Sequence, residues 1–155
     1  MIHGSCLCGG VRFEVERLKE PFELCHCNRC RKSSGSAFLA MVGADPADFC
    51  WTEGRELVAH YDAPILERPP AYRRSFCSRC GSPVPDPDMQ GSFFELPAGC
   101  LDDDPGVRPD KHIFTDFASG WYEVRDDLPR LDKATLRAQR IAAWRAAHPE
   151  ESGAT

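Results

Sequence analysis

The spacing of the cysteines constrains this chain more than any other feature. Seven of its nine cysteines fall into three short clusters, and nine is an odd number that cannot pair completely within one chain. Spacings this short also do not connect distant loops, as structural disulfides do. Metal binding is therefore the leading explanation. The clusters are Cys6-Leu7-Cys8, Cys25-His26-Cys27-Asn28-Arg29-Cys30 and Cys77-Ser78-Arg79-Cys80.

Composition limits the class of protein. With 155 residues, 42% of them hydrophobic, the chain fits one domain. It begins without the basic and apolar segments of a secretory signal and has no apolar run of the ~20 residues that a membrane span needs, so we expect a cytoplasmic protein without a membrane partner. Nineteen basic and 24 acidic residues give a net charge of -5, which argues against a nucleic-acid partner.

Short apolar or alternating segments bounded by Gly, Pro or Asp predict β-strands. The Ala118-Ser119-Gly120 segment, between two aromatic-rich runs, predicts a hairpin connection. Six prolines indicate a loop-rich middle because proline lacks an amide donor. The predicted strands are residues 11–15, 37–42, 57–61, 93–96, 112–117 and 121–124, and the prolines are Pro64, Pro69, Pro70, Pro83, Pro85 and Pro87.

The end of the chain predicts a helix. Asp132 is a suitable N-cap for residues 133–147, and Pro149 follows the segment. Leu136, Ile141 and Trp144 form an imperfect apolar stripe, and residues 150–155 are expected to fray. The sequence therefore predicts one mainly β domain with a C-terminal helix, whose small core would benefit from metal cross-links.

The first and last cysteine clusters suit a structural zinc site. Cys77-x-x-Cys80 can direct two sulfurs at one ion, and Gly81 leaves amide donors available to those thiolates. Cys6 and Cys8 offer two more sulfurs, so the four together would close a tetrahedral site.

The middle cluster suits a more open site. Cys25, Cys27 and Cys30 can hold one zinc ion while a fourth position stays available to water, thiol or substrate. Three thiolates on Zn(II) carry a formal charge of about -1 and four carry about -2, so the open site is the better Lewis acid. Spacing alone leaves an alternative, in which Cys50, Cys100 or His26 supplies a fourth ligand and closes a second structural site.

Basic residues and histidines add candidate functions. Arg29, Arg31 and Lys32 could stabilise thiolates or attract an anionic ligand, or could simply be solvated. His26 and His112 are candidate proton carriers, although each could instead have a packing role. Two aromatic pairs, Phe114 with Phe117 and Trp121 with Tyr122, either line a pocket or pack in the core; Cys50 and Cys100 fit small core residues or incidental thiols.

The ordered clusters resemble the glutathione-dependent formaldehyde-activating enzyme (GFA) family, which includes centromere protein V-like members. The resemblance covers roughly residues 3 to 125, with smaller agreements at Ala98-Gly99, Leu101-Asp102 and Trp121-Tyr122. The motifs that carry it are Gly4-Ser5-Cys6-Leu7-Cys8-Gly9-Gly10-Val11, Cys25-His26-Cys27-Asn28-Arg29-Cys30-Arg31-Lys32, Phe76-Cys77-Ser78-Arg79-Cys80-Gly81 and His112-Ile113-Phe114.

This resemblance implies a fold of several coiled antiparallel β-sheets, similar to a Rab-interacting accessory protein, and two zinc ions per chain. With the predicted C-terminal helix, we expect a zinc-binding domain over residues 1–130, a helix over residues 131–148 packed on that domain, and a flexible tail over residues 149–155. The resemblance implies structural zinc at one set of cysteines and catalytic zinc at the other. The structural set is Cys6, Cys8, Cys77 and Cys80, and the catalytic set is Cys25, Cys27 and Cys30.

The activity that the resemblance implies is carbon-sulfur lyase chemistry. A small thiol, glutathione first, and an aldehyde, formaldehyde first, would be joined or cleaved, as in S-(hydroxymethyl)glutathione synthesis. Arg29, Arg31 and Lys32 would attract the carboxylates of the thiol. The competing functions are a glutathione or thiol carrier and a noncatalytic zinc-stabilised interaction module, and the coordination number at the middle cluster discriminates between them.

Overall fold

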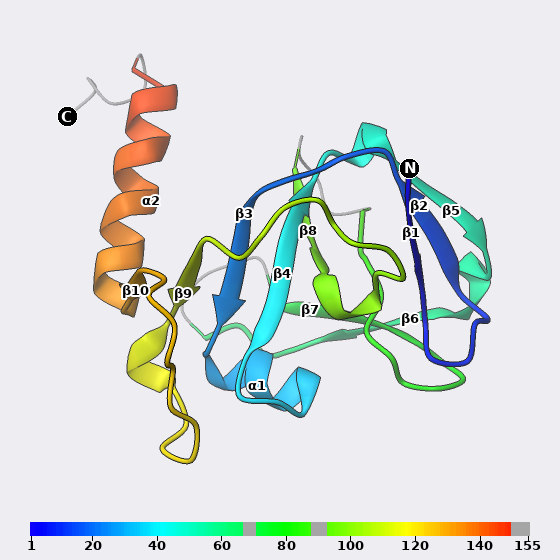
Figure 1. The fold of residues 1–155 in the computed structure, drawn as a ribbon, viewed down its shortest axis with the longest axis horizontal. Helices are drawn as coiled ribbons and strands as arrows, with labels where there is room; N and C mark the ends of the chain where they lie inside the picture. Colours follow the sequence, from blue (N-terminus) through cyan, green and yellow to red (C-terminus); the bar gives the residue numbers. More distant parts are fainter. Residues whose placement is uncertain (67–70, 88–92, 150–155) are drawn as a thin grey trace.

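Three β-sheets and two α-helices form the molecule, and the computed structural model describes residues 1–66, 71–87 and 93–149 of the chain (Figure 1). The first sheet has the order β1-β2-β5, the central sheet β10-β9-β3-β4-β8, and the third β6-β7. The first sheet contains β1 (Ile2–Ser5), β2 (Arg12–Val15) and β5 (Phe49–Glu53). The central sheet contains β3 (Leu18–Cys25), β4 (Leu39–Ala44), β8 (Phe94–Pro97), β9 (Lys111–Ile113) and β10 (Arg130–Leu131), and the third contains β6 (Val58–Asp62) and β7 (Arg73–Cys77).

The central sheet has two chemically different faces. Because side chains alternate along a strand, the register that pairs Phe22 with Val42 and Ala44 with Phe94 places these apolar residues on one face. Their face forms the largest buried cluster, which also takes in Phe13 and Val15 of β2. The register that pairs Glu23 with Lys111 and Met41, and Cys25 with Leu39 and Ile113, defines the opposite face.

Two helices flank this opposite face and the carboxyl end of β3. Helix α1 (Asn28–Ser34) directly follows β3, and Gly35, with φ 68°, ends it by donating its N–H to the carbonyl of Arg31. Helix α2 (Lys133–Ala147) stands beside β9 and β10 at the side of the molecule opposite the first sheet (Figure 1). Leu136 of α2 is buried in a small cluster that includes Cys25, Leu39 and Ile113.

The predicted C-terminal helix is confirmed. Asp132 caps α2 by accepting a hydrogen bond from the N–H of Thr135 at 2.7 Å. The predicted apolar stripe is only partly buried, because Leu136 is 3% exposed whereas Ile141 is 40% and Trp144 48% exposed. The mainly β class with several sheets and a C-terminal helix is likewise confirmed.

Two strand predictions need correction. The expected hairpin between residues 112–117 and 121–124 is wrong: only Lys111–Ile113 is a strand, and it pairs in parallel with β3 on one side and β10 on the other. Both edges of β9 are thereby used, and Phe114, with φ 55°, leads into a 3₁₀ turn. The sheets are mostly antiparallel, but these two parallel pairings make the central sheet mixed.

The other predicted strands correspond, with shifted bounds, to β2, β4, β6 and β8. The charged strand β3 was not predicted, and neither were β1, β5, β7 and β10. Of the prolines predicted in connections, Pro69 and Pro70 lie outside the described residues, as does the predicted fraying end at residues 150–155. In the described part of the chain, neither α1 nor α2 combines the length and apolarity required to cross a membrane.

Candidate metal sites and active-site cavity

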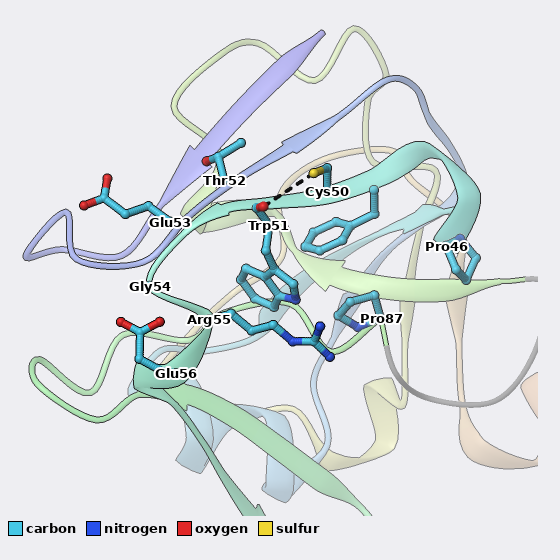
Figure 2. Close-up of a pocket in the computed structure, with 10 residues that line it drawn as sticks. Pro46, Cys50, Trp51, Thr52, Glu53, Gly54, Arg55, Glu56 and Pro87 are labelled. Carbon is cyan, nitrogen blue, oxygen red and sulfur yellow. Dashed lines mark hydrogen bonds between the residues drawn. The ribbon is translucent and has the colours of Figure 1, made fainter.

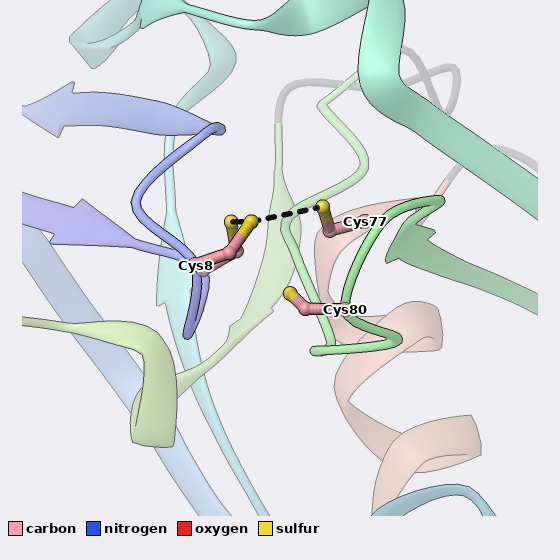
Figure 3. Close-up of side chains that lie close together, drawn as sticks. Cys8, Cys77 and Cys80 are labelled. Atoms are coloured by element: carbon pink, nitrogen blue, oxygen red, sulfur yellow. Dashed lines mark hydrogen bonds between the residues drawn. The ribbon is translucent and has the colours of Figure 1, made fainter.

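Four cysteines from two distant segments meet in one cluster. The sulfurs of Cys6, Cys8, Cys77 and Cys80 all lie within 4.8 Å of one another. Cys8 Sγ is 3.5 Å from Cys6 Sγ and 3.9 Å from Cys77 Sγ, and Figure 3 shows Cys8, Cys77 and Cys80 facing one another. Four sulfurs at tetrahedral corners with Zn–S distances of ~2.3 Å would be ~3.8 Å apart. The cluster therefore fits a zinc ion.

Local backbone structure shapes both halves of this four-cysteine cluster. In the β1–β2 connection, the N–H of Val11 donates to Cys6 Sγ at 3.2 Å, and Gly9 adopts a left-handed conformation with φ 69°. Cys77 ends β7, and Gly81, with φ 73°, closes the following turn by donating its N–H to the carbonyl of Cys77. The N–H of Val11 thus stabilises the Cys6 sulfur as a thiolate, and the turn closed by Gly81 holds Cys77 and Cys80 on one side of the cluster.

Cys80 also has a source of thiolate stabilisation. Its Sγ lies 3.3 Å from the hydroxyl oxygen of Ser82. Hydrogen bonding by the side chain and then the backbone of Ser82 lowers the pKa of Cys80 to about 5. Ser82 Oγ also accepts the N–H of Leu7 at 3.0 Å, so one serine connects the two halves of the cluster.

The second cluster is built at the junction of β3 and α1. Cys25 is the last residue of β3, Cys27 is the N-cap of α1, and Cys30 lies in the first turn of the helix. The N–H of Cys30 donates to Cys27 Sγ at 3.4 Å, so the cap itself is a thiol. The sulfurs of Cys25, Cys27 and Cys30 all lie within 4.8 Å of one another.

Proximity makes these three thiols strongly interdependent. Interactions with Cys25 and then Cys30 lower the pKa of Cys27 to about 2, whereas interactions with Cys27 and Cys30, together with burial, raise the pKa of Cys25. One thiolate therefore forms readily, and further ionisation puts like charges in close contact. A bound cation would relieve this repulsion, so the chemistry of the cluster fits zinc.

None of the three alternative fourth ligands joins this three-cysteine cluster among the described residues. Cys50 is exposed on β5, where its Sγ donates to the carbonyl of Trp51 and borders a separate hollow of about 610 Å³ (Figure 2). Cys100 is 6% exposed and packs in the large apolar core. His26 does not belong to this group of candidate metal ligands either.

A cavity of about 500 Å³ opens onto the three-cysteine cluster. Leu39, Met41 and Ile113 of the central sheet and the aromatic rings of Phe114 and Phe117 supply its apolar lining. Of the four aromatic residues considered from the sequence, only this pair lines the cavity, whereas Trp121 is 72% exposed. A ligand at the cysteines would therefore be partly shielded from water.

The predicted cations occupy different positions. Arg29 lines the cavity, and its guanidinium lies over the ring of Tyr72, 5.5 Å from the ring centroid. Arg31 and Lys32 are not among the described lining residues. Arg31 Nη2 instead donates to Asn28 Oδ1 at 2.6 Å within α1.

The two candidate histidines form a buried chain. His26 Nε2 lies 2.7 Å from His112 Nδ1, and His112 Nε2 lies 3.0 Å from a carboxylate oxygen of Asp126. Both imidazoles are almost completely buried, and burial followed by repulsion from His112 lowers the pKa of His26. Neither belongs to the described cavity lining. Any contribution to proton transfer in the cavity would have to be indirect.

Four charged lining residues were not predicted from the sequence. Glu23 and Glu95 come from the central sheet, and Lys133 and Arg140 come from α2. Burial, then repulsion from Glu23, raises the pKa of Glu95. Side chains alternate along β3, so Glu23 lies on the same face as Cys25. The sequence would have indicated this position for Glu23 if residues 18–25 had been predicted as a strand.

Comparison with known proteins defines the class. Residues 1–117 match the sequence profile of the family described as glutathione-dependent formaldehyde-activating enzyme, GFA. The chain belongs to this enzyme family, as the cysteine motifs indicated.

Two individual proteins are similar to the chain. A Halomonas elongata protein named "Putative glutathione-dependent formaldehyde-activating enzyme" is 31% identical over 156 residues, which cover 99% of each chain. A solved Rhodobacter sphaeroides protein aligns with a TM-score of 0.47 and 22% identity, over 83% of this chain and 98% of that chain.

Proposed function

We propose that this chain is a zinc-dependent, carbon-sulfur lyase-like enzyme that joins or cleaves a small thiol and an aldehyde. The first pair to test is glutathione and formaldehyde, with S-(hydroxymethyl)glutathione as the adduct. The observation that carries the proposal is the convergence of Cys25, Cys27 and Cys30 at a cavity, with no fourth protein ligand in the group among the described residues. Family membership supports the same reaction.

The two donor sets support the proposal of two zinc ions per chain. Four sulfurs would hold one ion in a closed structural site, while three sulfurs would hold the other with one position available. Zinc bound by three cysteines would supply a Lewis acid that favours the thiolate form of an incoming thiol.

The residues of the chain would hold and shield the reactants. The apolar lining limits water around the cysteines, and Arg29 provides a cation for a carboxylate of the thiol. In the synthetic direction the S–H bond of the thiol and the π bond of the aldehyde carbonyl break, a C–S bond forms, and the carbonyl oxygen gains a proton; cleavage reverses each change. His26 lies between Cys25 and Cys27 in the sequence and is hydrogen-bonded to His112, but neither histidine lines the cavity. We therefore assign both histidines an indirect role in proton transfer.

The test measures the rate of exchange between thiol, aldehyde and adduct, because the adduct also forms without protein. Wild type, zinc-free protein and Cys27→Ser should be compared at equal reactant concentrations, with Cys50→Ser as the control for an exposed cysteine outside both clusters. We expect acceleration only by zinc-loaded wild type and the control. Glutathione binding without acceleration would replace the enzyme by a carrier, and absence of both binding and acceleration would favour an interaction module.

A further inference from the structure

Helix α2 forms one wall of the cavity at the three-cysteine cluster, although it begins after residue 117, where the match to the family profile ends. Lys133, Leu136 and Arg140 are spaced three and four residues apart and therefore share one face of the helix. Leu136 packs in the small cluster that contains Cys25 and Cys30, and the two cations line the cavity. The helix thus presents positive charge beside the candidate reaction site.

An ion-pair network fixes this wall against the sheet. Arg140 Nη2 donates to Glu23 Oε2 at 2.7 Å, and Glu23 is 3% exposed. Lys111 Nζ lies 3.8 Å from the other carboxylate oxygen of Glu23, so two cations share this buried carboxylate. Glu23 precedes Cys25 by two residues on the same face of β3, which couples the position of Arg140 to the strand that carries the cysteine.

The accessible charge favours an anionic ligand. Arg29 from α1 and Lys133 and Arg140 from α2 line the cavity together with two carboxyl groups, those of Glu23 and Glu95, so the cations of the lining outnumber its carboxyls. This local excess of positive charge contrasts with the net charge of -5 of the chain.

We infer that Arg140 and Lys133 are specificity-determining residues, which together with Arg29 select thiols that carry a carboxylate. The inference rests on the proposed function for the role of the thiol, and it adds the residues of α2 that recognise the carboxylate of that thiol. A guanidinium has five N–H donors, so Arg140 can bind Glu23 and still offer donors to a carboxylate in the cavity. The C-terminal helix then acts as the selectivity element of the site.

The first experiment compares two small thiols that differ in charge. The ratio of kcat/KM for 3-mercaptopropionate to that for 2-mercaptoethanol, with formaldehyde, should fall about five- to tenfold in Arg140→Gln, because a charge-assisted hydrogen bond is lost. Arg140→Lys should recover part of the ratio by keeping the charge. Arg145→Gln, on the same helix and outside the described lining, should leave the ratio unchanged. An equal loss for both thiols would overturn the inference.

The second experiment measures binding without catalysis. S-methylglutathione retains both carboxylates but has no thiol, so calorimetry of its binding reports recognition even if no thiol reacts. We expect the affinity for S-methylglutathione to fall about five- to tenfold in Arg140→Gln and in Lys133→Gln. Wild type should bind the diethyl ester of this compound more weakly than the acid by a similar factor. Unchanged affinity in both variants would overturn the inference. Carboxylate-dependent binding without any rate acceleration would retain it while rejecting the proposed enzyme.

Discussion

The two cysteine clusters use the same ligand chemistry in opposite structural settings. The four-cysteine cluster joins the β1–β2 connection to the end of β7, about 70 residues away in sequence. The three-cysteine cluster lies within six consecutive residues and opens onto a cavity. The first arrangement suits holding a fold together and the second suits chemistry, so we propose that the first cluster serves stability and the second serves function.

Removing a ligand from the four-cysteine cluster should have the largest effect on stability. Cys77 is fully buried, and serine cannot replace its sulfur as a strong zinc ligand. We expect Cys77→Ser to lose one zinc ion and several kcal/mol of unfolding free energy. Thermal unfolding and metal content would measure both losses. Retention of two zinc ions and wild-type stability would contradict the structural role of this cluster.

Cys27→Ser should separate the two clusters in the other direction. Serine at the N-cap can still accept the N–H that Cys27 accepts, so the stability change should stay within about 1 kcal/mol. The zinc content should fall from two to one per chain, with the reaction rate reduced to that of the zinc-free protein. If Cys27→Ser and Cys77→Ser lose stability equally, the proposed division between the clusters is wrong.

Graded chelation should remove the two zinc ions one after the other, first from the three-cysteine cluster and then from the four-cysteine cluster. Four thiolates from two segments should retain zinc better than three thiolates from one local segment. We expect the first ion to leave before global unfolding, as followed by metal analysis alongside circular dichroism. Simultaneous loss of both ions with unfolding would show that the sites are not independent.

The smallest expected effect concerns Glu95, at the edge of the cavity. Its folded-state pKa is raised above 4.5 by burial and then by Glu23, so its contribution to stability is present below pH 4.5 and lost as the pH rises through the raised pKa. Glu95→Gln stays neutral throughout. Its stability relative to wild type should therefore increase as the pH rises from 4.5 towards neutral.

Chemical unfolding of both proteins across this pH range measures the difference. Glu56→Gln, in the exposed 3₁₀ segment near the first sheet, is a matched control for the loss of one carboxylate. A relative stability of Glu95→Gln that falls with rising pH would contradict the expected sign.

The sequence predicted those parts of the molecule that depend on local signals. Short spacings located both cysteine clusters, and Asp132 marked the start of α2 at the residue where the structure begins it. Strand β3 was missed because three charged residues and a proline interrupt the apolar pattern of a strand; they are Lys19, Glu20, Pro21 and Glu23. The buried carboxylate of Glu23 is compensated by Arg140 and Lys111, which come from distant segments. No local pattern contains that information.

The hairpin error has a similar origin. The aromatic-rich segment after Lys111–Ile113 has strand propensity, but β9 finds its partners in β3 and β10 instead of in the following residues. Parallel pairing joins segments far apart in the chain, so it leaves no turn signal. The same long-range pairing brings Ile113 to the cavity, and α2 brings Lys133 and Arg140, so these lining residues could not be predicted from local patterns.

The order of the two sites along the chain has a consequence for biosynthesis. All ligands of the four-cysteine cluster have been translated once Cys80 is complete. The cavity wall also needs Arg140, which is translated about 60 residues later, or roughly 3 to 12 seconds later at common elongation rates. Under the proposed division of roles, a nascent chain could bind metal at the four-cysteine cluster before α2 closes the cavity at the three-cysteine cluster. Maturation of the enzyme would end with the docking of α2, so a ribosome-bound chain ending before residue 133 should capture metal without yet discriminating between thiols.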